Sequence, residues 1–270
     1  MRWLISWVGG PAGYVNPSRE AAIASDKSVV GLMSLPVGQR QKGLHYHSVT
    51  EIYVILKGEL EGYDHTGHPH RAGPLDCMYI PKGVPHGVRN CGAEDCELVW
   101  VHDGIEKIGT SKYFMDGVVP ADYPPQPDIT IVRFADLEPS YSPFKAKEVE
   151  WMRWVVSWVA GKKEDGYENY NPGVAAASEK CGIGMTVIQP GQKSVPYTQK
   201  DAETLVVMRG KALINFAEES KGKWREELGR LDGAYVPGCA VRGVRNHGDE
   251  PLFLMCVQER PQRVGNVVYH

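Results

Sequence analysis

Short apolar runs dominate the chain, and Gly, Pro, Asn or Asp bounds most of them. One run covers residues 51–57 and ends at Gly58, and residues 59–63 follow at once as a second expected strand. Other runs cover 77–80 and 97–102, and residues 18–24 alone have the pattern of a short helical turn. Short runs separated by turn residues are typical of β-strands, whereas a long 3.6-residue period is missing. The pattern predicts an all-β chain whose strands close into barrels.

The second half of the chain repeats the first. Met1-Arg2-Trp3 recurs as Met152-Arg153-Trp154, and Gly87-Val88-Arg89-Asn90 recurs unchanged as Gly243-Val244-Arg245-Asn246. The step between matching positions grows slightly along the chain, as small loop insertions would cause. Two copies of one small barrel are therefore expected.

A cluster of prolines over 119–127 separates the two copies and is typical of a linker. The predicted organisation is an N-terminal barrel over 1–118, a Pro-rich linker over 119–147 and a C-terminal barrel over 148–270.

Composition narrows the class of protein. The 270 residues are 42% hydrophobic and 23% charged, with a net charge of −3, so nucleic acid and anionic membrane are not expected as partners. The apolar run over 1–8 is too short to span a bilayer. The six cysteines form no CxxC pair, which favours reduced thiols and a cytoplasmic location, with a Cys91–Cys96 bridge as the alternative.

Four residues of the N-terminal half have the spacing of metal ligands. His45 and His47 are separated by one residue, so they point the same way from a strand, and Glu51 keeps that parity. His86 arrives from a later strand. Three imidazoles and one carboxylate match the ligands of first-row divalent metals.

The corresponding positions of the C-terminal half lack imidazoles and carry Tyr197, Gln199, Glu203 and Arg242. Arginine cannot ligate a cation, because it has a fixed positive charge and no free lone pair. We therefore expect one metal per chain, in the N-terminal barrel. An Arg242–Glu203 pair that fills the lost metal site is the favoured interpretation of this cluster, and a pocket for a carboxylated ligand is the alternative.

These motifs resemble those of the bicupins, which are two fused cupin barrels. The first cupin motif, G-x5-H-x-H-x3,4-E-x6-G, is matched by His45, His47, Glu51 and Gly58, with Gln39 in place of its first glycine. The second, G-x5-P-x-G-x2-H-x3-N, is matched by Pro81, Gly83, His86 and Asn90, with Leu75 in place of its first glycine. The resemblance implies two tandem cupin barrels of the jelly-roll type, a bound metal and a homodimer.

The resemblance does not select a reaction, because metal-binding cupins include dioxygenases, decarboxylases, isomerases, lyases, cyclases and hydrolases. Four ligands leave two positions of an octahedral ion open, which suits Fe(II), with Mn, Ni or Zn as alternatives. We expect an Fe(II) dioxygenase acting on a small oxygen-chelating substrate, such as an aromatic diol, hydroxyketone or diketone. A non-redox isomerase, lyase or cyclase that works through an enolate, and a non-catalytic small-molecule-binding cupin, are the alternatives.

Two further residues are candidates for catalysis. His102 shares strand parity with Trp100, so it is either a general base near the metal or a histidine at the barrel mouth. Tyr53 shares parity with Glu51 and either lines the same pocket or packs in the core. His65, His68 and His70 form a second cluster, which we expect to be exposed turn histidines because Gly67 and Pro69 lie among them.

Overall fold

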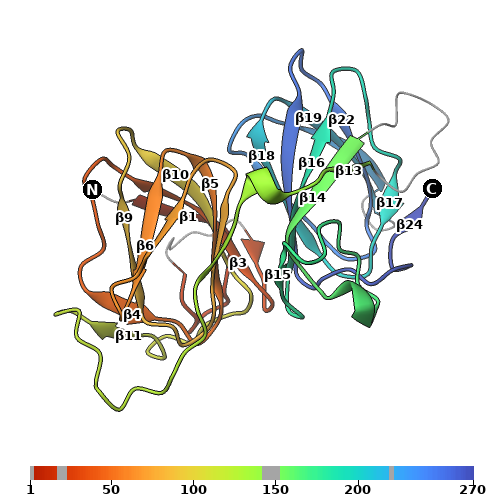
Figure 1. Cartoon of the computed structure of the whole chain (residues 1–270). Coiled ribbons are helices and arrows are strands. Elements are labelled where there is room, and N and C mark those ends of the chain that lie inside the picture. The colour runs from red at the N-terminus through yellow and green to blue at the C-terminus, as the bar shows by residue number, and fades with distance from the viewer. Residues whose placement is uncertain (1–2, 17–22, 142–152, 219–221) are drawn as a thin grey trace. The chain divides into compact units, whose positions relative to one another are not determined.

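Figure 1 presents the computed structural model of the chain, which describes residues 3–16, 23–141, 153–218 and 222–270. The described residues form strands, loops and two short 3-10 turns, η1 (Phe134–Asp136) and η3 (Lys163–Asp165). They divide into two compact units, Met1–Asp136 and Leu137–His270. The prediction of an all-β chain with two tandem barrels is confirmed. Within the described part of the chain, no helix has the length and apolar character needed to cross a membrane.

The first unit holds the N-terminal barrel, which is built from two sheets. A seven-stranded sheet has the order β12-β8-β5-β10-β3-β1-β2, and a five-stranded sheet has the order β11-β4-β9-β6-β7. The strands are β1 (Trp3–Gly9), β2 (Ile23–Ala24), β3 (Val29–Leu35), β4 (Leu44–Tyr46), β5 (Glu51–Lys57), β6 (Leu60–Asp64), β7 (Pro69–Ala72), β8 (Cys77–Ile80), β9 (His86–Asn90), β10 (Cys96–His102), β11 (Lys112–Phe114) and β12 (Thr130–Val132).

The second unit holds the C-terminal barrel and repeats this plan. Its larger sheet has the order β13-β14-β16-β23-β18-β21, with β15 paired to β14, and its smaller sheet has the order β20-β19-β22-β17-β24. The strands are β13 (Ser140–Tyr141), β14 (Arg153–Ala160), β15 (Ala176–Ala177), β16 (Gly182–Ile188), β17 (Tyr197–Thr198), β18 (Glu203–Arg209), β19 (Ala212–Glu218), β20 (Gly222–Leu228), β21 (Gly233–Val236), β22 (Val241–Asn246), β23 (Leu252–Gln258) and β24 (Val268–Tyr269).

Each barrel closes around an apolar core contributed by both of its sheets. In the N-terminal barrel, Met33, Ile55 and Leu98 of the larger sheet pack in one cluster with Leu60 and Val88 of the smaller sheet. Strand β3 is buried along its whole length, in agreement with a sequence in which Ser34 is the single polar residue. The corresponding cluster of the C-terminal barrel includes Leu205, Val207, Ile214, Val244 and Leu254.

The repeated Gly-Val-Arg-Asn segment has a structural role at its asparagine. The buried Asn246 side chain donates two hydrogen bonds from Nδ2, to the carbonyls of Ile188 (2.8 Å) and Glu250 (2.7 Å). Its Oδ1 accepts from the backbone N–H of Gly248 at 2.9 Å. Asn90 makes the matching bonds in the N-terminal barrel, with Leu35, Glu94 and Gly92. In each barrel the asparagine side chain therefore fixes the turn that leads into the next strand. Asn90 does so before β10, and Asn246 does so before β23.

Leu75, which stands in place of the first glycine of the second motif, has the left-handed backbone conformation that glycine adopts most easily. Leu75 has φ 68° and Leu231, its counterpart, has φ 69°. The left-handed region costs a non-glycine residue roughly 1–2 kcal/mol. In both barrels the leucine N–H donates a 2.8 Å hydrogen bond, to the Ile55 or the Val207 carbonyl, which helps to hold this turn.

Two segments of the stretch expected to be a linker are strands of the barrels. Thr130–Val132 pairs with β8 and extends the larger sheet of the first unit. The apolar Ile131 and Val132 are suited to a strand at this edge of the sheet. Arg133 then binds the Asp76 carboxylate at 2.7 Å. The Ser140–Tyr141 strand pairs with β14 of the second unit, and residues 142–147 lie outside the described residues.

Two smaller expectations concern residues 18–24 and the cysteines. Ile23–Ala24 form strand β2 rather than a helical turn, because they pair in parallel with the end of β1, and the rest of that segment lies outside the described residues. All six cysteines lie in the described residues as free thiols, so Cys91 and Cys96 are not bridged.

The asparagine contacts predict a stability effect. Asn246→Ala removes three hydrogen bonds and leaves buried backbone groups unpaired, so we expect the C-terminal unit to lose about 2–4 kcal/mol of unfolding free energy. The exposed Asn215 is a matched control, and Asn215→Ala is expected to change stability by less than about 0.5 kcal/mol. Urea titration of both variants measures the difference, and equal midpoints would contradict this role.

Candidate metal centre

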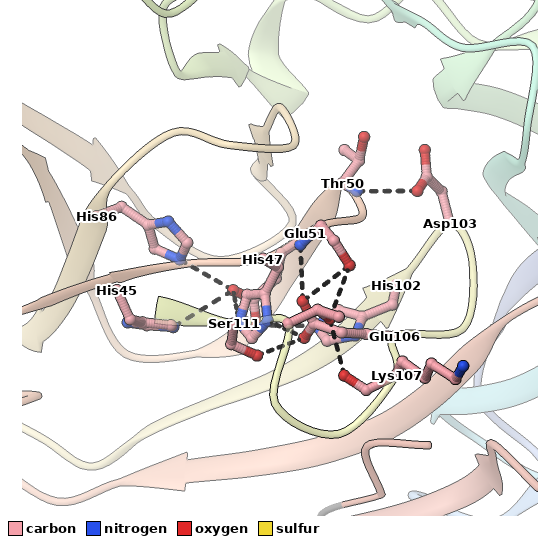
Figure 2. A network of polar contacts seen from close by, with 12 residues as sticks. His45, His47, Thr50, Glu51, His86, His102, Asp103, Glu106, Lys107 and Ser111 are labelled. Atoms are coloured by element: carbon pink, nitrogen blue, oxygen red, sulfur yellow. Dashed lines mark hydrogen bonds and ion pairs between the residues drawn. The ribbon is translucent and has the colours of Figure 1, made fainter. Parts of the chain in front are cut away.

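The four residues predicted as metal ligands meet between the two sheets of the N-terminal barrel. His45 of β4 and His86 of β9 are direct cross-strand partners in the smaller sheet. Glu51 begins β5 of the larger sheet, and His47 directly follows β4. One nitrogen or oxygen from each of the four lies within 4.8 Å of the others, and all four residues are buried (Figure 2).

The imidazole nitrogens converge on the Glu51 carboxylate. Glu51 Oε2 lies 2.9 Å from His86 Nε2, 3.4 Å from His47 Nε2 and 4.0 Å from His45 Nε2. His86 Nδ1 donates to the Val84 carbonyl at 2.8 Å, so a neutral His86 directs the lone pair of Nε2 at the carboxylate. Two lone pairs at that distance repel each other unless a proton or a metal ion lies between them. The donor set therefore fits a divalent metal ion.

The charge state of Glu51 agrees with this fit. Burial alone would raise the pKa of its carboxyl group, but the neighbouring His47, His102 and His86 hold that pKa well below its ordinary value. The carboxylate is thus ionised and available as an anionic ligand.

Glu106 is a residue of the site that the sequence did not reveal. It is fully buried in the loop after β10, and its Oε2 lies 2.5 Å from His47 Nδ1. The Ser48 N–H donates to its Oε1 at 2.6 Å, and the Ser111 hydroxyl donates to its Oε2 at 2.8 Å. Burial raises the pKa of Glu106, but these partners outweigh it and lower the pKa to about 2.

An ionised Glu106 fixes the tautomer of His47. Its Oε2 accepts a hydrogen bond from Nδ1–H, so Nε2 keeps its lone pair and faces the other three ligands. No sequence pattern marks this role, because Glu106 lies in an irregular loop without strand parity. The sequence offers only a weak signal for it, which is that an acidic residue follows Gly104 and Ile105.

His102 lies inside the barrel beside Glu51 and not at its surface. The two residues are partners across β10 and β5, and His102 Nε2 lies 3.5 Å from Glu51 Oε1. The side chain is buried, and within the described residues neither ring nitrogen has a hydrogen-bond partner. Thr50 and Asp103 exchange hydrogen bonds of 2.9 and 3.2 Å next to this pair, which fixes the ends of both strands (Figure 2).

Tyr53 and the second histidine cluster are not part of the group of four ligands. Tyr53 pairs with Trp100 across the same strands and packs in the apolar core cluster. His70 Nε2 lies 3.2 Å from Asp64 Oδ2, and the His68 ring lies 4.9 Å from the His70 ring at the turn between β6 and β7. Among the described residues, this cluster does not form a group that could hold a metal.

In the C-terminal barrel, an ion pair stands where the ligands would be. Arg242 Nε donates to Glu203 Oε1 at 2.6 Å, and the Tyr197 hydroxyl donates to the same oxygen at 2.9 Å. Both charged groups are almost fully buried. Arg242 is thus the cation that balances Glu203, and the pair expected from the sequence is present.

Glu106 generates a testable prediction. Glu106→Gln keeps the shape of the side chain but removes its charge, so His47 loses the partner that fixes its tautomer. We expect metal affinity to fall about 10- to 100-fold while the fold is retained. The control is Glu94→Gln, which removes an exposed carboxylate paired with Lys57. Competition with a chelator measures both affinities, and unchanged affinity in Glu106→Gln would contradict the role.

Comparison with known proteins agrees with this geometry. Residues 31–102 match the model of the cupin domain family. The dimethylsulfoniopropionate lyase DddQ of Ruegeria pomeroyi is 38% identical over 66 residues, which are 24% of this chain and 32% of that protein. The match therefore spans about a third of the length of this curated relative.

Solved structures resemble the chain over most of its length. Oxalate decarboxylase of Bacillus subtilis, studied for its Mn(II) centres, superposes with a TM-score of 0.63 at 16% identity and covers 91% of this chain and 71% of its own. The formate complex of Lactobacillus farciminis oxalate decarboxylase gives 0.63 at 17% identity, with coverages of 91% and 80%. Residues 31–102 thus form a cupin domain, and the chain as a whole has the fold of a bicupin, with the His-His-Glu-His group in its first barrel.

Proposed function

We propose that the N-terminal barrel is the active site of a metal-dependent lyase or decarboxylase, which cleaves a small carboxylated substrate without net oxidation. The observation that carries this proposal is the position of His102. Its ring is buried beside Glu51, and within the described residues neither nitrogen is engaged in a hydrogen bond. A buried imidazole that lies 3.5 Å from a metal-ligand carboxylate and makes no short hydrogen bond is suited to moving a proton.

The relatives support the substrate class and the absence of net oxidation. The matched relative is named for the lyase reaction of dimethylsulfoniopropionate, and the matched structures are oxalate decarboxylases. By their names, these enzymes cleave small carboxylates. None of these relatives is named as an oxygenase, so we give bond cleavage precedence over the dioxygenation that the sequence alone favoured.

The residues of the barrel would have separate roles in such a reaction. A divalent ion held by His45, His47, Glu51 and His86 would supply a Lewis acid that polarises a substrate oxygen. The buried anionic Glu51 and the Glu106–His47 pair keep the ligand set fixed. His102 then removes or returns a proton on the substrate carbon or leaving group. Trp100, whose ring lies 5.3 Å from His102, is an apolar wall that excludes water.

Fe(II)-dependent dioxygenation of an oxygen-chelating substrate is the second candidate. It is favoured by the donor set itself, because three imidazoles and one carboxylate leave two positions of an octahedral ion for other ligands. Iron, manganese, nickel and zinc remain predictions for the native metal. The homodimer and the cytoplasmic location also stay predictions.

Oxygen dependence separates the two candidates. We expect the metal-loaded protein to turn over small carboxylates, with oxalate and dimethylsulfoniopropionate as first probes, equally fast in air and under argon. Products are followed by NMR and O₂ by an electrode. Turnover that stops under argon and consumes O₂ in stoichiometric amount would replace the lyase proposal with dioxygenation.

The role of His102 is tested separately. His102→Gln keeps a polar side chain of similar size but removes the base, so we expect kcat to fall about 10²- to 10⁴-fold with unchanged metal content. His68→Gln, at an exposed turn of the same barrel, is the matched control and is expected to retain activity. Loss of metal in His102→Gln, or full activity, would rule out this assignment.

A further inference from the structure

The C-terminal barrel contains a cavity of about 90 Å³ at the place of the lost metal site. Tyr197, Gln199, Glu203, Gln258 and Gln262 line it. Gln258 pairs with Glu203 across β23 and β18, as His102 pairs with Glu51 across β10 and β5. The cavity thus occupies the position that the metal-ligand set and His102 take in the N-terminal barrel.

The residues around this cavity have changed from ionisable groups to amides. Gln199 takes the position of His47, and Gln258 takes that of His102. Gln262 follows β23 at the distance at which Glu106 follows β10, so a buried carboxylate has become the neutral amide of the same shape. These three positions therefore offer amide donors and acceptors to a cavity that Glu203 and Glu168 also line.

Several of these polar atoms lack a hydrogen-bond partner within the described residues. They are Nε2 and Oε1 of Gln262, Nε2 of Gln199 and, next to the cavity lining, Nη2 of Arg242. All three side chains are almost fully buried, at 2%, 3% and 0% exposure. Buried polar groups are normally paired, so these atoms indicate a missing hydrogen-bonding molecule. Both Gln262 atoms are unpaired, so exchanging its oxygen and nitrogen leaves this conclusion unchanged.

Charge excludes an anion from the cavity. The positive charge of Arg242 is already balanced by Glu203 at 2.6 Å. Glu203 and Glu168 both line the cavity, and no Lys, Arg or His among the described residues does. A carboxylated ligand, the alternative raised by the sequence, would therefore add an unpaired negative charge beside two acidic side chains.

The unpaired atoms also exclude a cation. Three of them are donors, which need acceptor lone pairs, and one is an acceptor, which needs a donor. A cation such as an amidinium offers no lone pair, whereas an amide offers a carbonyl oxygen and an N–H together. The cavity of about 90 Å³ is larger than the roughly 10–15 Å³ that one water needs, so it has room for a small ligand.

We propose that the C-terminal barrel binds a small uncharged molecule that carries a primary amide or urea group. The amide edge of the ligand pairs with both atoms of Gln262, and its carbonyl oxygen accepts a further hydrogen bond from Gln199. This site is separate from the proposed active site and does not depend on its reaction.

Three isosteric probes test the proposal on the full metal-loaded chain. Acetamide, acetate and acetamidinium share one shape but carry neutral, negative and positive charge. We expect isothermal titration to detect acetamide and to give at least about tenfold weaker binding for both ions. Absence of acetamide binding, or tighter binding of either ion, would overturn the proposal.

Variants locate the binding in the cavity. Gln262→Met and Gln199→Met should each weaken acetamide binding by about tenfold or more, because each removes hydrogen-bonding atoms. Gln189→Met makes the same change at an exposed position of this barrel and should leave binding unchanged. Equal affinity in all three variants would contradict the assignment.

A crystal of the parent protein soaked in acetamide gives a reading that does not depend on any variant's folding. An amide within hydrogen-bond distance of Gln262 is the expected result. Ordered waters alone on Gln262 and Gln199 would overturn the proposal.

Discussion

The structure of both barrels depends on how a buried carboxylate at the start of one strand is balanced. Removing a carboxylate from water is costly unless opposite charge or hydrogen bonds surround it. In the N-terminal barrel Glu51 faces imidazoles, whose neutral forms bring lone pairs and leave the balancing charge to a metal ion. In the C-terminal barrel the equivalent Glu203 faces the permanent cation of Arg242. The arginine at the position of His86 thus supplies in the C-terminal barrel the positive charge that a metal ion would supply in the N-terminal one.

The same constraint explains why the rest of each site differs. Where a metal is bound, the ligands need fixed tautomers, and the ionised Glu106 supplies this for His47. Where the charge is already balanced, a second buried carboxylate would be unpaired, and Gln262 stands there instead. The residues behind the ligands have therefore changed together with the ligands. This coupling supports chemistry in one barrel and binding of a neutral molecule in the other.

The fold and the four ligands could be predicted because both depend on the spacing of residues that are close together in the sequence. Strand parity puts His45 and His47 on one side, and the repeat reveals the paired barrels. Glu106 was missed because an irregular loop has no parity, and its role appears only when the fold brings it to His47, a residue far from it in the sequence. The placement of His102 needed its register with Glu51 across two strands, and the pairing of β12 needed the open edge of β8. Such long-range pairings leave no short-range pattern.

The central claim is that the N-terminal barrel holds a metal ion and the C-terminal barrel does not. Anomalous X-ray scattering from a crystal of protein purified without a metal-affinity tag tests it directly, because it locates and identifies each ion. The account predicts one peak per chain, bounded by His45, His47, Glu51 and His86, and no peak beside Arg242 and Glu203. A peak in the C-terminal barrel, or none among the four ligands in protein saturated with metal, would contradict it.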